Sequence, residues 1–217
     1  HVRSRRQRQM CIRDRSCNTA FVEMSEQIGA DELRKYAKAF GVGENYDLGV
    51  STSGGTLGDL PDGAATAQSA IGQRDVTMTA LQAAVMAGTV ANKGTRMQPY
   101  LVNRITDAQM KDVRTTKPKK ADQAVNEETA ATLTDLMYAS ERSSWGYDGN
   151  GFASKTGTAE HGEGLAPHVW YVAFDPERDI AVGVVVKNGG NLGESATGGK
   201  VSGPIGRAIL RAYQGEQ

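Results

Sequence analysis

The sequence has few of the residues that mark several specialised protein classes. Only two of its 217 residues are cysteines, which excludes a small scaffold held together by disulfides. No apolar run approaches the roughly 18 residues that a membrane-spanning helix needs. Lysine and arginine together number 25, as do aspartate and glutamate, so the chain has no overall positive charge for binding nucleic acid. These features leave a globular protein with a core.

The zero net charge conceals an uneven distribution of charged residues. Residues 1–15 contain six arginines and one aspartate, a net charge of +5, while the remaining 202 residues have a net charge of −5. No apolar segment follows these arginines, as one would in a secretory signal, and no aromatic residues are interspersed for binding RNA. The segment resembles translated adapter or vector sequence. We therefore predict that residues 1–15, with Cys11, are a non-native basic leader. The fold is predicted from residues 16–217.

The first two thirds of the remaining chain are predicted to be mainly helical. Apolar residues recur at helical spacing in four segments, residues 16–28, 30–40, 78–92 and 127–142. Gly29 is suited to end the first helix and Asn126 to cap the fourth. Residues 41–75 show little periodicity, which predicts a long loop around a site. Two short strands are expected at residues 100–105 and 112–115.

The last third is predicted to be β-structure followed by a helix. Runs rich in β-branched and aromatic residues indicate three strands, at residues 151–159, 168–174 and 179–187. The sequence Asp-Pro-Glu-Arg at 175–178 favours a turn, so the last two strands should form an antiparallel hairpin. A glycine-rich loop over 188–199 then leads to a helix at 201–213. Helices, then three strands, then a helix predict an α+β fold rather than alternating βαβ units.

Two short motifs carry polar side chains suited to catalysis. The sequence Lys-Thr-Gly-Thr at 155–158 lies on the first of the three strands. Gly157 weakens a plain strand, and glycine at such a position often marks the close approach of a ligand or another backbone. The sequence Ser-Cys-Asn at 16–18 lies at the start of the first helix, where it would by itself be a helix cap. The two motifs in this order indicate more than either alone.

Other candidate sites are weaker on chemical grounds. The segment Gly193–Lys200 resembles a phosphate-binding loop, but it has one glycine too many, and Val201 stands where a Ser or Thr should bind magnesium. His161 and His168 are seven residues apart without a ligand pattern around them, so we expect no metal site and no cofactor. His161 directly follows the lysine-containing strand and is a candidate for lining the cleft, whereas His168 is expected to be structural.

Residues 16–217 resemble the C-terminal two thirds of the transpeptidase domain of class B penicillin-binding proteins. K-T-G and S-x-N are two parts of that family's signature, whose third part is S-x-x-K. The resemblance also covers the segments SCNTAF, AIGQRDVTMTALQAAVMAGTVANKGTRMQPYLV, KTGTAEHG and HVWYVAFDPERDIAVGVVV, in the family's order, and is greatest to the actinobacterial monofunctional type. It implies a β-lactamase/transpeptidase-like α+β fold, here incomplete, with three C-terminal antiparallel strands, a helical subdomain and a C-terminal helix.

The resemblance implies acyl transfer to a serine, with release of the terminal D-Ala of a peptidoglycan stem peptide and cross-linking by a neighbouring amine. Ser16 would relay protons, and Asn18 would hold the substrate backbone. Lys155 would supply positive potential for an anionic carboxyl terminus, which the hydroxyls of Thr156 and Thr158 would bind. The backbone N–H of Thr158 would be one oxyanion donor.

One departure from the family pattern decides what this chain can do. No serine in the sequence is followed three residues later by a lysine, so the nucleophile motif S-x-x-K is absent, and only the leader precedes Ser16. We therefore expect a fragment that is itself inactive. Two alternatives stay open: a non-catalytic scaffold of the same fold, and a serine β-lactamase or penicillin sensor.

The resemblance also implies partners and a location. The partners would be stem peptides ending in D-Ala-D-Ala, β-lactam antibiotics that imitate them, and proteins of the cell-wall synthesis complex, with no nucleic acid. The location would be the extracytoplasmic face of the bacterial cytoplasmic membrane, with an upstream anchor that this chain lacks. The strand at 179–187, without the neighbour that the family provides, would present an unpaired apolar edge.

Overall fold

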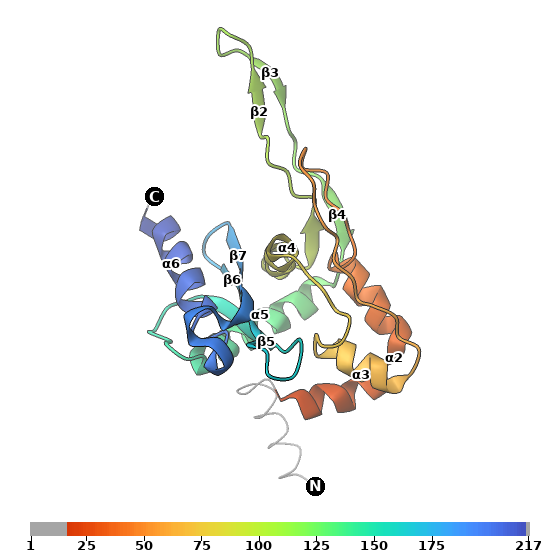
Figure 1. Ribbon diagram of the computed structural model, residues 1–217. Coiled ribbons are helices and arrows are strands. Elements are labelled where there is room, and N and C mark those ends of the chain that lie inside the picture. Colours follow the sequence, from red (N-terminus) through yellow and green to blue (C-terminus); the bar gives the residue numbers. More distant parts are fainter. Residues whose placement is uncertain (1–16, 216–217) are drawn as a thin grey trace.

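The computed structural model describes residues 17–215, which form a body of helices around a small sheet and one hairpin that projects from it (Figure 1). The helices are α2 (Asn18–Ala39), α3 (Gly63–Ala70), α4 (Ala80–Ala91), α5 (Glu127–Ser143) and α6 (Ser202–Gly215). The strands are β1 (Thr95–Met97), β2 (Arg104–Thr106), β3 (Asp112–Thr115), β4 (Lys120–Gln123), β5 (Ala153–Ala159), β6 (His168–Asp175) and β7 (Ile180–Val186). A 3₁₀ segment, η1 (Lys187–Ser195), follows β7. The order confirms the predicted α+β class.

The last three strands form the predicted antiparallel sheet, in the order β5-β6-β7. β6 and β7 pair along their whole length, from Val169 opposite Val186 to Asp175 opposite Ile180, so the predicted hairpin is confirmed. β5 pairs with β6 and lies at the end of the sheet, with Lys155 opposite Val172. Because side chains alternate along a strand, Lys155 and its cross-strand neighbours occupy the opposite face from the residues next to them in sequence.

A helix covers each face of this sheet, and a glycine lies at each point of closest approach. α4 packs on β7, where a methyl group added to Gly183 would overlap the carbonyl oxygen of Ala80. α6 packs on the other face, where a methyl group added to Gly206 would overlap the ring of Tyr171. Two buried clusters follow from this arrangement, one made of Phe152, Tyr171, Ala173, Val182 and Leu210 and the other of Ala87, Val90, Ala153 and Phe174.

The N-terminal helices agree with the prediction, except for one additional helix, α3. α2 contains both helices expected at 16–28 and 30–40, which meet at a kink where Gly29 has φ 78° and ψ 167°. Only glycine adopts such a backbone conformation readily, so Gly29 ends the first helix as expected. The structureless loop predicted over 41–75 is wrong for α3, whose first turn is capped by the Asp62 carboxylate accepting from the Ala65 N–H (2.8 Å). This helix consists mainly of small residues without apolar periodicity, so the sequence pattern did not indicate it.

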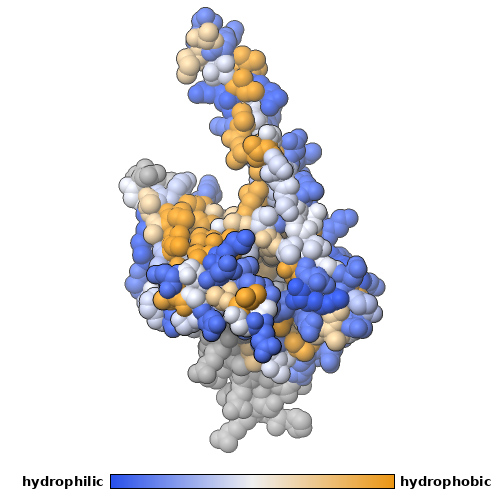
Figure 2. Space-filling model, viewed as in Figure 1, coloured by the Kyte–Doolittle hydropathy of each residue, from blue (hydrophilic) through white to orange (hydrophobic). Residues whose placement is uncertain are grey.

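Residues 98–119 form an arm that extends from the body and ends in the β2–β3 hairpin (Figure 1). The strand predicted at 100–105 is largely wrong, because regular pairing begins only at Arg104. Pro99 and Pro118 have no backbone N–H to donate to a strand ladder, and they separate the β2–β3 pair from the inner β1–β4 pair. The β1–β4 pair was not predicted from the sequence. Apolar side chains run along the arm (Figure 2), and its exposed large hydrophobic residues are Tyr100, Leu101, Val102, Ile105, Met110 and Val113.

Candidate active site

The Lys-Thr-Gly-Thr motif lies in the middle of β5, as predicted. β5 pairs only with β6 among residues 17–215, so the outer edge of this strand is open within that range. Lys155, Thr156 and Gly157 are half-buried and Thr158 is exposed. Lys155 and Gly157 share one face of the sheet with Trp170 and Val172, while the two threonines share the other. The motif therefore combines an accessible strand edge with side chains that project from both of its faces.

A cavity of about 410 Å³ lies beside the lysine face of β5. Its polar lining comes from Lys155, Thr156 and Thr158 of the motif, from His168 at the start of β6, and from Gln73 and Thr77 before α4. Its apolar lining comes from β5, β6, α4 and the segment before α4, and it consists of Ile71, Val76, Met78, Ala83, Ala159, Trp170 and Val172. A concave, mainly apolar surface with a few convergent polar groups is the usual form of a small-molecule site.

Lys155 is the cation of this site. Its ammonium group donates a hydrogen bond to the carbonyl oxygen of Thr156 (2.6 Å), and burial lowers the pKa of Lys155 below its ordinary value. A neutral carbonyl does not neutralise the ammonium charge, which therefore stays available to an anionic ligand in the cavity. The role expected for Lys155 from the sequence stays a prediction.

Gly157 packs closely against Trp170 on the lysine face, where an added methyl group would lie 3.3 Å from Trp170 Cβ. From the opposite face the backbone of Gly198 approaches the motif, because a methyl group on Gly198 would lie 2.8 Å from the Gly157 carbonyl oxygen. The predicted approach of another backbone is thus confirmed, on the face away from the cavity. The glycine-rich loop before α6 supports β5 from behind.

The positions of the two histidines are the reverse of those predicted, which placed His161 at the cleft. His168 lies on the wall of the cavity, whereas His161 is exposed and does not belong to that wall. Their rings stack with centroids 4.0 Å apart, and His168 Nδ1 accepts from the Asn188 N–H (3.1 Å). Burial, together with the nearby His161 and Lys187, lowers the pKa of His168 below its ordinary value. A neutral His168 keeps Nδ1 free to accept this hydrogen bond.

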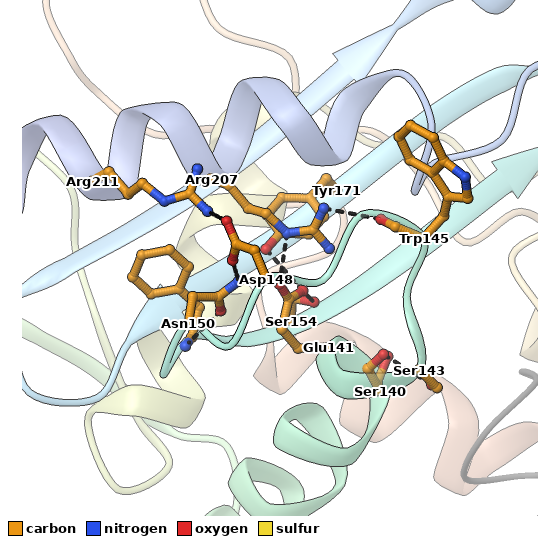
Figure 3. A network of polar contacts seen from close by, with 11 residues as sticks. Ser140, Glu141, Ser143, Trp145, Asp148, Asn150, Ser154, Tyr171, Arg207 and Arg211 are labelled. Atoms are coloured by element: carbon orange, nitrogen blue, oxygen red, sulfur yellow. Dashed lines mark hydrogen bonds and ion pairs between the residues drawn. The ribbon is translucent and has the colours of Figure 1, made fainter.

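A buried ion pair, which was not predicted from the sequence, lies behind β5. Glu141, at the end of α5, is 0% exposed, and Arg207 of α6 is 2% exposed. Arg207 Nε donates to Glu141 Oε1 (2.6 Å), and the hydroxyls of Ser154 and Tyr171 donate to Oε2 (Figure 3). Burial alone would raise the pKa of Glu141, but hydrogen bonds from Arg207, Ser154 and Asn150 outweigh it and keep the pKa below its ordinary value.

The comparison with protein families identifies the fold. Residues 11–211 match the model of the penicillin-binding protein transpeptidase domain. The chain belongs to this family. The matched range begins inside the arginine-rich segment, and the predicted boundary at residue 15 stays a prediction. The resemblance that the two motifs suggested is confirmed over almost the whole chain.

This chain is similar to several mycobacterial peptidoglycan D,D-transpeptidases and to solved structures of one of them. The chain is 44% identical over 207 residues to the peptidoglycan D,D-transpeptidase PbpA of Mycolicibacterium smegmatis, covering 91% of this chain and 42% of that protein. It is 43% identical to PbpA of Mycobacterium tuberculosis, covering 93% of this chain and 43% of that protein. The ceftriaxone acyl-enzyme complex of M. tuberculosis penicillin-binding protein A has a TM-score of 0.86 at 42% identity, covering 91% of this chain and 46% of that one. The actinobacterial type is thus confirmed, and the chain spans less than half the length of these relatives.

The structure accounts unevenly for the transpeptidase motifs. The lysine motif lies on the cavity wall, but Ser16 lies outside the described residues. α2 begins at Asn18, which is exposed and does not belong to the cavity wall, and Cys17 is the N-cap without a side-chain capping bond. The structure therefore brings Lys155, Thr156 and Thr158 together and does not join Asn18 to them. The roles of Ser16 and Asn18 stay predictions.

Neither a metal site nor a membrane span is found among residues 17–215 of this transpeptidase-family chain. No group of three or more His, Cys, Asp or Glu side chains in that range is placed to hold a metal ion. No helix there combines the length and the apolar character needed to cross a bilayer.

Proposed function

We propose that this chain is part of a peptidoglycan D,D-transpeptidase and supplies the lysine-containing wall of its active site. The observation that carries the proposal is the Lys155–Thr158 motif on an open strand edge, beside a cavity of about 410 Å³, in a member of the penicillin-binding protein transpeptidase family. The acceptor would be the amine of a neighbouring peptidoglycan strand, and the donor a stem peptide ending in D-Ala-D-Ala. β-Lactams would bind the same groups because they imitate that end.

The residues of β5 suit this reaction chemically. The half-buried ammonium of Lys155 attracts the carboxylate of the terminal D-Ala, and the hydroxyls of Thr156 and Thr158 donate hydrogen bonds to it. The backbone N–H of Thr158 stabilises the oxyanion that forms when the serine nucleophile attacks the D-Ala carbonyl. Ser16 relays the proton to the leaving amine, and Asn18 binds the substrate backbone. The acyl-enzyme then passes its acyl group to the acceptor amine.

The nucleophile itself must lie in sequence that this chain does not contain. No serine here stands three residues before a lysine, and the chain spans only 42% of the length of the M. smegmatis PbpA that it matches. We propose that the parent protein carries S-x-x-K upstream of Ser16. Residues 1–217 alone would then form no covalent adduct with penicillin.

Labelling with fluorescent penicillin tests the proposal. The product of the full upstream coding sequence should become labelled, its Lys155→Ala variant should be labelled at least tenfold more slowly, and residues 1–217 should stay unlabelled. Labelling of 1–217 would contradict the assignment of the nucleophile to missing sequence. Rapid turnover of a chromogenic β-lactam by the longer protein would favour a β-lactamase over a transpeptidase.

The proposal extends to partners and location. The solved acyl-enzyme complexes of M. tuberculosis penicillin-binding protein A with ceftriaxone and penicillin G support β-lactam binding at the same site. We propose that the parent protein works on the extracytoplasmic face of the cytoplasmic membrane, held by an upstream anchor, with proteins of the cell-wall synthesis complex. The apolar side chains along the arm support such a protein contact, because exposed apolar groups of this kind favour protein–protein interaction.

A further inference from the structure

Two side chains from outside β5, one on α6 and one on β6, hold the Glu141 carboxylate in place. Arg207 Nε of α6 donates to Oε1 at 2.6 Å, and the Tyr171 hydroxyl of β6 donates to Oε2 at 3.0 Å. Arg207 is itself fixed, because its Nη1 donates to the carbonyl oxygen of Trp145 (3.0 Å). Figure 3 shows these side chains converging on Glu141 between α6 and the sheet. The carboxylate thus has a defined place relative to both the helices and the sheet.

Two of its remaining contacts lead to the beginning of β5. The Ser154 hydroxyl donates to Oε2, and Ser154 directly precedes Lys155. Asn150 donates from Nδ2 to Oε1 (3.0 Å), and its own Oδ1 accepts from the Phe152 N–H (3.0 Å). The strand is therefore connected to the same carboxylate at Phe152 and at Ser154, immediately before the motif.

We infer that Glu141 is a positioning residue for the candidate active site, which holds Ser154 and thereby sets the place of Lys155, Thr156 and Thr158. The inference rests on the proposed function, since it concerns the reaction of that site. Ser154 is 0% exposed and faces away from the cavity, so neither it nor Glu141 touches a ligand there. Their effect must pass through the backbone of β5.

A merely structural role explains this network less well. Replacing a buried ion pair by well-packed apolar residues is often neutral or stabilising, so core stability alone does not call for these charges. A carboxylate adds several directional acceptors on one rigid group, and here four donors from three elements and a loop use them. Positioning matters at β5 because a displacement of about 1 Å in a catalytic group can slow a reaction about a hundredfold.

The test uses the longer protein of the proposed function, labelled over a range of fluorescent penicillin concentrations. This separates the dissociation constant of the non-covalent complex from the acylation rate constant. Ser154→Ala removes the direct hydrogen bond from β5 to Glu141 and leaves the ion pair and the Asn150 contact in place. We expect its acylation rate constant to fall about tenfold or more, with less than a threefold change in the dissociation constant.

Ser25→Ala is the matched control. Ser25 is 3% exposed and its hydroxyl donates to the Val22 carbonyl oxygen (2.7 Å) within α2, so the same change is made at the same burial away from β5. It should acylate at the normal rate. Glu141→Gln is the second variant and should slow acylation as Ser154→Ala does. If it fails to fold, Ser154→Ala alone decides.

The outcomes separate the two proposals. Normal acylation rate constants in Ser154→Ala, with or without a lower melting temperature, would overturn the positioning role, because a structural residue changes only the folded fraction. Equal slowing in Ser25→Ala would overturn it as well. An unlabelled wild-type protein would instead reject the proposed function, and this inference with it.

Discussion

Strand β5 and the arm are both antiparallel β-structure at the margin of the molecule, yet β5 begins in the core and the arm lies in solvent. β5 begins with Ala153 and Ser154, both 0% exposed, and has helices packed on both faces of its sheet. The arm carries Val113 with 67% of its surface exposed, and every residue of its strand β3 is exposed. The strand that bears the lysine motif is thus closely packed, whereas the arm is exposed to solvent. Substitutions should therefore have large effects around β5 and small ones on the arm.

The largest effect is expected from Arg207→Met. The substitution leaves the Glu141 carboxylate buried without its cation, and breaking a buried pair in this way costs about 3–5 kcal/mol. Urea unfolding at neutral pH measures the loss. Lys35→Met, which breaks an exposed pair with Glu32 on α2, is the control and should leave the free energy of unfolding nearly unchanged. Equal losses in the two variants would refute the contrast between buried and exposed pairs.

A smaller loss is expected where α4 meets β7. Gly183→Ala would force its methyl group against the Ala80 carbonyl oxygen and the Ala84 N–H, which costs about 1–3 kcal/mol of overpacking. Gly63→Ala is the matched control, because nothing lies within 4 Å of its added methyl group at the start of α3. Thermal unfolding of both variants measures the difference. A normal melting temperature for Gly183→Ala would show that α4 can move off the sheet at little cost.

Acid should weaken the network behind β5. Since the pKa of Glu141 is lowered in the folded protein, its ionisation stabilises the fold above the ordinary carboxyl value of 4.5, and this contribution is lost as the pH falls through the folded-state pKa. Glu141→Gln has no such carboxylate. The difference in unfolding free energy between wild type and Glu141→Gln should therefore shrink below pH 4.5. Urea titrations from pH 7 to pH 3 would reveal a constant difference if this linkage were absent.

The smallest effect is expected on the arm. Val113→Ser replaces an exposed side chain that has no part in either buried cluster, so the free energy of unfolding should change by less than about 0.5 kcal/mol. The same urea measurement applies. A loss above 1 kcal/mol would show that the hairpin packs against something in solution, and the contrast with β5 would then fail.

The sequence pattern was informative where local chemistry decides the structure. Asn126 caps α5 by accepting from the Thr129 N–H (2.8 Å), as predicted, and the turn at 175–178 produces the expected β6–β7 hairpin. The Lys-Thr-Gly-Thr motif also lies on its predicted strand. Each of these features depends on residues within a few positions of one another, which periodicity and turn chemistry can detect.

The missed features depend on contacts between distant parts of the chain. Glu141, Ser154 and Arg207 come from three elements, and no local pattern pairs them. One signal was present, because Glu141 follows the partly buried Leu133 and Met137 at helical spacing and so shares their face of α5. Leu136, between them in sequence, is 44% exposed. A charged residue on an apolar helix face is a reason to look for a partner of opposite charge.

The arm also determines how the molecule should respond to proteases. Arg104, Lys111 and Arg114 are exposed on a ribbon that no core supports, and such projections are the preferred sites of nicking. Brief trypsin treatment should cut there first and leave β5 to β7 whole. The β1–β4 pair at its base would still hold the two pieces together, so the nick would be visible only after denaturation.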